Sequence, residues 1–200
     1  MFTGIIEGIG KIVEINDDRD NKSFTVKSNI ASELKVDQSF SHDGVCLTVV
    51  EVNAKNSTYK VTAIKETLDR TSLANWQIGH EVNLERAMKA DGRFDGHFVQ
   101  GHVDTKGIVD EFYDANGSWM IFITYPDGIG ITVNKGSITV NGVSLTVVDS
   151  FPNVFSVAII PYTWENTNLS QLKKGSVVNL EFDIFGKYVQ RLQQLEMSRI

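Results

Sequence analysis

The sequence is poor in cysteine and has no long apolar run, and each absence narrows the class of protein. Cys46 is the only cysteine among 200 residues, so the chain cannot form an internal disulfide and fits a reducing compartment. No apolar run approaches the length of a membrane span. The opening stretch MFTGIIEGIGK lacks the basic region and long apolar core of a signal peptide. We therefore expect a cytoplasmic protein.

Basic residues are also scarce. The 19 lysines and arginines are outnumbered by 25 aspartates and glutamates, which gives a formal charge of −6. An acidic chain without a Lys/Arg cluster is a poor nucleic-acid binder. The short GIG segments at Gly8 and Gly128 lack the spacing of dinucleotide or phosphate fingerprints. With 42% hydrophobic and 22% charged residues, the composition is that of an ordinary globular protein.

A long internal repeat is the strongest positive signal. SFSHDGVCLTVV begins at Ser39 and SITVNGVSLTVV begins at Ser137, with seven of twelve positions identical. Three further segment pairs keep the same order, namely GIIEGIGKIVEI with GHVDTKGIVDEF, KETLDRTSL with PYTWENTNL, and GHEVNLE with GSVVNLE. The period of about 97 residues is too long for a solenoid repeat, so each copy is expected to be a domain. The boundary falls near residues 90–100.

Each copy has the pattern of short β-strands. FTVKS, STYKVTAI, WMIFITY and NVFSVAII are rich in β-branched and aromatic residues. Turn-forming residues separate such runs at NDDRDN, NAKNS and DANGS. About six strands in 90 residues predict an all-β fold of small closed barrels, which leave no exposed strand edge; a β-sandwich is the alternative.

The repeated segment predicts a hairpin with one polar face. Asp43-Gly44 and Asn141-Gly142 are favoured two-residue turns. In the first copy the polar face then consists of two facing pairs, Ser39 with Thr48 and Ser41 with Cys46. The opposite, core-like face consists of Phe40, Val45, Leu47 and Val49. The polar face of the second copy consists of Ser137, Thr139, Ser144 and Thr146.

A hydroxyl pattern that is repeated in both copies favours a binding site in each barrel. Duplicated sites suggest two similar ligands, one per barrel. Hydroxyls suit a neutral polyol or heterocycle, whereas phosphate would call for Arg, Lys or a glycine-rich loop. The alternative is that serine and threonine are simply common on solvated strand faces.

The two copies differ in their histidines. The joining segment DGRFDGHFVQGHVD contains His97 and His102, whereas the first copy has Ile5 at the position of His102. Such an asymmetry is what chemistry on two identical molecules needs, with one donor and one acceptor, and histidine suits acid–base work. A metal-binding His-x4-His pair is an alternative that lacks a clear third ligand, and an ordinary polar linker is another.

The C-terminal stretch KYVQRLQQLEMSRI is the only clear amphipathic helix in the sequence. Its apolar stripe consists of Tyr188, Val189, Leu192 and Leu195. The stripe has no obvious domain to cover, so it suggests self-association through helix packing. Packing back onto its own barrel is the alternative.

Several of these motifs together resemble the riboflavin synthase family of the α-subunit type. They are MFTGIIE, the paired GVCLTVV and GVSLTVV, KETL, GHFVQGHVD and NLEFDIFGKYVQR. The resemblance covers essentially the whole chain, and the combination is specific although each motif alone is weak. It implies two six-stranded Greek-key barrels, the lumazine-binding barrels of residues 1–97 and 98–186, and a trimerisation helix of residues 187–200.

The resemblance also implies a reaction. Two molecules of 6,7-dimethyl-8-ribityllumazine are dismutated to riboflavin and 5-amino-6-(D-ribitylamino)uracil, the last step of riboflavin biosynthesis, without cofactor or metal. Each barrel would bind one lumazine, and the active site would form between the first barrel of one subunit and the second barrel of its neighbour in a homotrimer. An association with lumazine synthase is a further expectation.

The resemblance assigns site residues by position. Residues linked to catalysis in the family match Phe2, Ser39, Cys46, His97, His102 and Asp183. The binding residues assigned to the first barrel match Gly4, Ile5, Ile6, Cys46, Leu47, Thr48, Thr62, Ala63, Ile64, Lys65, Glu66 and Thr67. Those assigned to the second barrel match Gly101, His102, Val103, Lys135, Ser144, Leu145, Thr146, Ala158, Ile159, Ile160, Pro161, Tyr162 and Thr163.

The chemistry fits these groups. The 7-methyl protons of the lumazine are acidic because the ring delocalises the carbanion, and His102 could assist their removal. Water, the Ser39 hydroxyl or the Cys46 thiol could add at C7 of the other ring, and fixed orientation of the two rings would contribute most. Many family members have a second cysteine or another small residue where this chain has Val45, which by alternation points away from the polar face.

A non-catalytic function is the competing interpretation. Lumazine- and flavin-binding antenna proteins resemble the same family but lack the linker histidines and other active-site groups. This chain retains His97, His102, Cys46, Ser39 and Asp183, which favours the enzyme.

Overall fold

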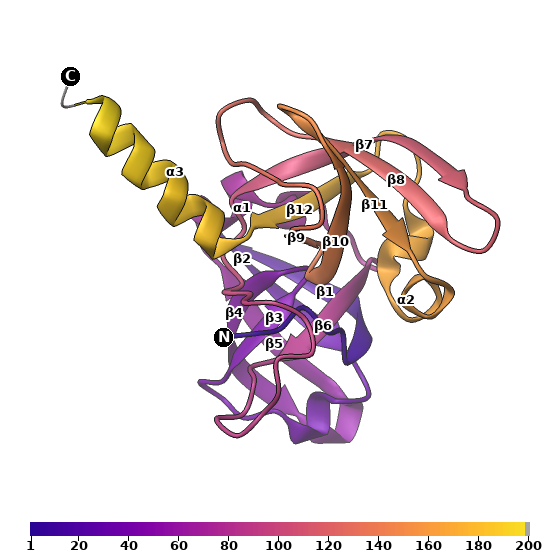
Figure 1. Cartoon of the computed structure of the whole chain (residues 1–200). Helices are drawn as coiled ribbons and strands as arrows, with labels where there is room; N and C mark the ends of the chain where they lie inside the picture. Colours follow the sequence, from indigo (N-terminus) through magenta and orange to yellow (C-terminus); the bar gives the residue numbers. More distant parts are fainter. Residues whose placement is uncertain (199–200) are drawn as a thin grey trace.

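The computed structural model describes residues 1–198 and consists of two β-barrels followed by a helix (Figure 1). The strands of the first barrel are β1 (Gly8–Asp18), β2 (Asn21–Lys27), β3 (Ser39–His42), β4 (Val45–Asn53), β5 (Thr58–Ala63) and β6 (Glu81–Arg86). Those of the second are β7 (Thr105–Asp114), β8 (Trp119–Thr124), β9 (Ser137–Val140), β10 (Val143–Ser150), β11 (Val154–Ile159) and β12 (Val177–Phe182). The helices are α1 (Lys65–Arg70), α2 (Pro161–Asn166) and α3 (Ile184–Met197), with short 3-10 turns at Ala31–Glu33, Ala54–Asn56, Ser72–Asn75 and Asn168–Gln171.

The two barrels have the same topology. The strand order is β1-β2-β5-β4-β3-β6 in the first and β7-β8-β11-β10-β9-β12 in the second, and both are closed. In each, three consecutive strands lie side by side and the strand before them returns beside the last, which is a Greek key. Bulges also recur, between Ile12 and Glu14 in β1 and between Val109 and Glu111 in β7. The prediction of a duplicated Greek-key barrel is confirmed, and the sandwich is excluded.

Strand alternation explains the core of each barrel. In β5, Tyr59, Val61 and Ala63 point inward and are buried, while the residues between them are partly exposed. The equivalent strand β11 contributes Phe155, Val157 and Ile159 to the second core. Each barrel therefore encloses its own cluster of side chains, and ligand sites must lie at the barrel surfaces.

The predicted hairpin register is confirmed, with one difference in exposure. Ser39 pairs with Thr48 and Ser41 with Cys46. The pair farther from the turn is exposed, but Ser41 is only 2% exposed and Cys46 is half-buried. Near the turn, the Gly101 carbonyl accepts from the Cys46 N–H at 2.8 Å, so a segment outside the first barrel lies against Cys46.

The barrels meet turn to turn. A Cβ placed on Gly44 would lie 2.9 Å from the backbone nitrogen of Gly142, so only glycine allows this approach. Around the turns, amides cross between barrels: Asn83 Nδ2 donates to the Asn141 carbonyl at 2.9 Å, and Asn179 Nδ2 donates to the Asp43 carbonyl at 2.9 Å. This matched pair of bonds fixes the relative orientation of the barrels.

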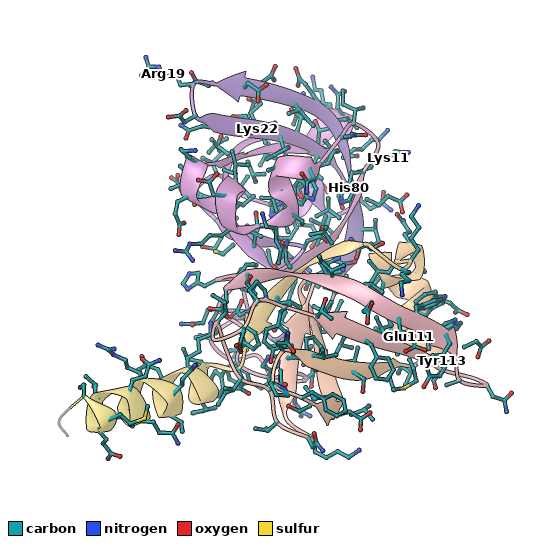
Figure 2. All side chains as sticks on the ribbon, turned by 90° about the horizontal axis from the view of Figure 1, so that it is seen from above. Lys11, Arg19, Lys22, His80, Glu111 and Tyr113 are labelled. Carbon is teal, nitrogen blue, oxygen red and sulfur yellow. The ribbon has the colours of Figure 1, made fainter. Side chains whose placement is uncertain are left out.

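Helix α3 stands away from both barrels (Figures 1 and 2). None of its residues is buried, and Tyr188 and Leu192 of the apolar stripe are 67% and 62% exposed. The stripe thus has no partner within residues 1–198, and the alternative that it packs onto its own barrel is wrong. The helix begins at Ile184, earlier than the residue 187 expected, and the expected last two residues, 199–200, lie outside the described residues.

The tips of the long hairpins point away from the contact between barrels. Figure 2 shows Arg19 at the tip of the β1–β2 hairpin, and Glu111 and Tyr113 on the β7–β8 hairpin at the outer side of the second barrel. These ends carry none of the predicted site residues. The predicted site residues lie instead nearer the contact between the barrels.

Candidate functional site

Two short crossing segments, residues 2–5 and residues 99–103, lie between the barrels. The Gly4 carbonyl accepts from the Ser144 backbone N–H at 2.8 Å, so the first segment lies on the hairpin of the second barrel. The Gly101 carbonyl accepts from the Cys46 backbone N–H at 2.8 Å, so the second segment lies on the hairpin of the first barrel. Each hairpin is therefore completed by the segment that precedes the other barrel.

This exchange changes the grouping of the predicted binding residues. Gly4 to Ile6 were expected with the first barrel, but they lie against Ser144, and Ile6 packs on the second core. Gly101 to Val103 were expected with the second barrel, but Val103 packs on the first core. The reason is physical. Each segment is a connection that leaves the barrel to which its sequence belongs and lies on the hairpin of the other barrel.

Glycine is required at both crossing points. Gly4 has φ of +79° and Gly101 has φ of +77°. A Cβ at Gly4 would lie 2.6 Å from the Ser144 Cβ, and a Cβ at Gly101 would lie 2.6 Å from the Cys46 Cβ. The left-handed backbone and the close approach both exclude larger residues.

Cys46 and His102 line one cavity of about 270 Å³ at the first barrel. The remaining wall comes from helix α1 and its neighbours, including the ion-paired side chains Glu66 and Arg70, whose Oε1 and Nε atoms are 2.6 Å apart. The Cys46 N–H is already bound to Gly101, so Cys46 offers a ligand its thiol and its carbonyl. The cavity joins a nucleophile, an imidazole and a carboxylate, a set suited to acid–base and addition chemistry.

Several predicted binding residues have side chains that pack into or against the barrel cores. The side chains of Leu47, Ala63 and Ile159 are buried in the cores, and Leu145 packs against the second core. Thr62 Oγ1 is 2.8 Å from Ser23 Oγ. The predicted binding residues with exposed or half-buried side chains are Ile5, Ile6, Cys46, Thr48, Thr62, Ile64, Lys65, Glu66, Thr67, His102, Val103, Lys135, Ser144, Leu145, Thr146, Ala158, Ile160, Pro161, Tyr162 and Thr163.

His97 lies on the polar face of the second hairpin. Its Nδ1 is 2.7 Å from Ser144 Oγ and its Nε2 is 3.2 Å from Thr139 Oγ1. Burial lowers the pKa of His97 below its usual value of 6.5, and the charge of Asp183 opposes that shift. The imidazole is therefore neutral near pH 7 and has one ring nitrogen that donates and one that accepts.

The remaining residues predicted to be catalytic are spread over three places. Phe2 is fully buried and forms an isolated bridge with Val99, so it links the two crossing segments. Ser39 is exposed at the outer end of β3. Asp183 Oδ1 accepts from the Phe185 N–H at 3.0 Å and caps helix α3. Only Cys46 and His102 of the predicted catalytic set line the same cavity.

Two glutamates at the site were missed by sequence reasoning. Glu85 in β6 and Glu181 in β12 are 4% and 3% exposed. Each accepts backbone N–H bonds from a crossing segment. The signal was present, because NLE occurs at the same place in both repeats, but a glutamate in a strand is usually solvent-facing.

The described residues limit the class of site in two ways. Within residues 1–198 no cluster of three or more His, Cys, Asp or Glu side chains could hold a metal ion. Over the same residues, no helix combines the length and apolar character that a membrane span requires.

Comparison with known proteins identifies related sequences. The family described as the lumazine binding domain matches twice, at residues 3–87 and 100–183. A riboflavin synthase of Actinobacillus pleuropneumoniae is 44% identical over 193 residues, which cover 96% of this chain and 89% of that protein. One of Bacillus subtilis is 39% identical over 193 residues, with the same two coverages of 96% and 89%.

A solved structure shares the fold. The crystal structure of LumP complexed with 6,7-dimethyl-8-(1'-D-ribityl) lumazine superimposes with a TM-score of 0.82 and covers 91% of this chain and 99% of that chain. Its sequence is 23% identical, so this likeness concerns the architecture of the two barrels alone.

Proposed function

The chain belongs to the riboflavin synthase family, and from this membership we propose how its two barrels carry out the reaction. Its activity is the formation of riboflavin from 6,7-dimethyl-8-ribityllumazine. One lumazine donates a four-carbon unit to a second, and 5-amino-6-(D-ribitylamino)uracil is the other product. The two products together contain all the atoms of the two substrates, so the transfer needs no external oxidant or reductant.

The single observation that carries the proposed mechanism is the shared cavity of Cys46 and His102. One lumazine binds the first barrel between β4 and helix α1, against the crossing segment at Gly101 to Val103. The second lumazine binds the second barrel beside Ser144, against the crossing segment at Gly4 to Ile6. The crossed backbone bonds support these two groupings.

The reaction begins with loss of a 7-methyl proton. His102 is exposed at the cavity rim and accepts this proton. The Cys46 thiol, the Ser39 hydroxyl or water adds at C7 of the other ring. The chain's main contribution is to hold two rings in one orientation, since positioning of two reactants lowers the barrier more than one proton transfer does.

His97 and Asp183 take a supporting part at the second barrel. The neutral imidazole is held by Ser144 and Thr139, so it presents a fixed hydrogen-bonding surface to the ribityl chain or ring. Asp183 joins this region to the start of helix α3. Phe2 positions the crossing segments and does not touch the substrate, because it is fully buried.

We propose that helix α3 assembles a homotrimer. The exposed stripe on a helix that leaves both barrels supports this assembly, and a neighbour's second barrel would then complete the site at Cys46. Truncation after Lys187 is expected to give a monomer with much lower activity and intact barrels. Sedimentation measures the mass, and a truncated protein that still sediments as a trimer would remove the helix from this role.

Two finer proposals concern the setting of the enzyme. We propose a cytoplasmic location, which the lone free cysteine supports. Association with lumazine synthase would deliver the substrate, and co-sedimentation of the two purified proteins tests it.

Turnover separates the enzyme from an antenna protein. The purified chain is incubated with 6,7-dimethyl-8-ribityllumazine, and riboflavin is followed by absorbance and chromatography. Riboflavin and the uracil product are expected in equal amounts. Stable lumazine fluorescence without either product would support the antenna function instead. Relatives at 39–44% identity that are riboflavin synthases, against 23% for LumP, favour turnover.

A further inference from the structure

We infer that Glu181 is a positioning residue that holds His102 over the first barrel's site from a strand of the second barrel. The inference rests on the proposed role of His102. Glu181 itself lies on β12, directly opposite Thr139 of β9, and so belongs to the rim of the second barrel. Its carboxylate reaches across to the segment that carries His102.

The contact is a two-point clamp. Glu181 Oε1 accepts from the Gln100 N–H at 2.7 Å, and Oε2 accepts from the His102 N–H at 2.9 Å. Hydrogen bonds to an ionised carboxylate are about twice as strong as neutral ones. Both oxygens are used, so the segment is held at two points on either side of Gly101.

The opposite side of the same segment is also fixed. The Gly101 carbonyl accepts from the Cys46 N–H at 2.8 Å. The turn at Gly101 is thus held on one side by Glu181 of the second barrel and on the other side by Cys46 of the first barrel. Hydrogen bonds on both sides of the segment therefore hold the backbone of His102 in place beside Cys46.

The first barrel carries a matched device without a histidine. Glu85 on β6 accepts from the Thr3 N–H at 2.7 Å and from the Gly4 N–H at 3.0 Å. The segment it holds carries Ile5 where the other carries His102. Glu85 is therefore an internal control: it has the same burial and the same type of bond, but its segment carries no titratable group.

The buried setting explains why the carboxylate matters. Burial raises the pKa of Glu181, and the N–H donors and Lys187 oppose that shift. Without those donors a buried carboxylate would be an unpaired charge, which strongly disfavours the fold. A substitution at Glu181 therefore acts by loosening the crossing segment, because the carboxylate that it removes is buried and not on the surface.

A double-mutant cycle separates positioning from bulk stability. Glu181→Gln keeps one acceptor but turns an amide NH₂ toward one of the two backbone N–H groups. We expect kcat to fall about 10- to 100-fold, since a displacement near 1 Å can cost that much. In a His102→Gln background the same substitution is expected to cost less than about threefold. Glu85→Gln is expected to cost the same factor in both backgrounds.

Backbone amide shifts give an independent readout. In ¹⁵N-labelled protein, loss of the carboxylate acceptor is expected to move the Gln100 and His102 amide protons upfield in Glu181→Gln and leave Thr3 and Gly4 in place. Glu85→Gln is expected to do the reverse. If Glu181→Gln does not fold, Glu181→Asp replaces it, because the shorter carboxylate keeps its charge but reaches only one of the two N–H groups.

The outcomes separate this inference from the proposed function. Suppose that His102→Gln turns over slowly and that Glu181→Gln lowers kcat by the same factor in the wild-type and His102→Gln backgrounds. That result overturns the role of Glu181 alone. Near wild-type kcat in Glu181→Gln also overturns it. Near wild-type turnover in His102→Gln overturns both roles, while a strong coupling confined to Glu181 supports the inference.

Discussion

The two barrels share a scaffold and differ in what faces their polar hairpins. In the first barrel Cys46 and His102 line one cavity. In the second barrel the equivalent Ser144 is already bonded to His97. Under the proposed function, the duplicated fold supplies two similar sites for two identical molecules, and the histidines make the sites chemically unequal. In this proposal, symmetry of binding and asymmetry of reaction come from separate residues.

A second difference lies beside the hairpins. In the second barrel Trp164 of helix α2 stacks between Phe112 and Trp119, with ring centroids at 5.4 and 4.5 Å. The matching position of helix α1 is Leu68, which packs on the first core. Helix α2 of the second barrel is therefore held by aromatic stacking, whereas helix α1 of the first barrel carries the Glu66–Arg70 ion pair.

The largest expected effect comes from removing the histidine asymmetry. His102→Gln is expected to lower kcat by about 10²- to 10⁴-fold and leave lumazine affinity nearly unchanged, because an acid–base group acts mainly in the transition state. The control is Ile5→Gln, which makes the same side chain at the matched position and should alter mainly KM. Steady-state turnover and fluorescence titration measure both, and equal kcat losses would contradict the asymmetry.

A smaller effect is expected from the two crossing glycines. Gly101→Ala and Gly4→Ala each place a Cβ 2.6 Å from a neighbouring Cβ at positive φ, so each should cost about 2 kcal/mol or more of unfolding free energy. Only Gly101→Ala displaces His102, so its kcat should fall further. Chemical unfolding and turnover of the two variants test this, and a greater kcat loss in Gly4→Ala would contradict it.

The pH dependence of stability is expected to reveal the burial of His97. The folded pKa of His97 lies below 6.5 because of burial. The folded state therefore binds fewer protons than the unfolded state, and stability falls as the pH drops below about 6.5. His97→Gln should remove part of this fall, by an amount on the order of 1 kcal/mol. NMR titration of the imidazole gives the pKa directly, and a value above 6.5 would contradict the burial argument.

The smallest effect is expected at the touching turns. Asp43 is buried and accepts from the Asn83 N–H, whereas the second barrel has Asn141 at the same place. Burial raises the pKa of Asp43, so the ionised form weakens stability as the pH rises above the unfolded value near 4. Asp43→Asn should stabilise the protein at pH 7 by no more than about 1 kcal/mol.

The reverse substitution provides the control for Asp43. Asn141→Asp should destabilise the protein at pH 7, because it buries a second carboxylate at the same contact. The difference between each variant and the wild type is expected to vanish below pH 4. Thermal unfolding over this pH range measures it, and a stabilisation by Asn141→Asp would argue against the desolvation explanation.

The fold could be predicted well from the sequence because its signals are local and are repeated in both halves of the chain. The Asp43-Gly44 turn and the alternation on either side of it fixed the register that pairs Ser39 with Thr48. Two of the residues carried over from the family, Cys46 and His102, line one cavity. The binding roles of the carried-over residues stay predictions until ligand is measured.

Long-range arrangement could not be predicted from the repeats. Sequence order suggested that Gly4 serves its own barrel, but its carbonyl bonds to Ser144 of the other. Glu181 was missed because a strand glutamate usually faces water, and only the crossing segment turns that position into a buried one. The burial of Ser41 was not predictable from the repeats either, because alternation places it on the same face as the exposed Ser39.

The crossed segments also set the order in which the site is completed during synthesis. The last strand of the first barrel ends at Arg86, but Gly101 must follow before Cys46 gains its backbone partner, and Glu181 comes 95 residues after that strand. At roughly 5–20 residues per second, the ribosome needs about 5–20 s to cover that interval. The strands of the first barrel are therefore synthesised early, and its site stays incomplete until the second barrel has been synthesised.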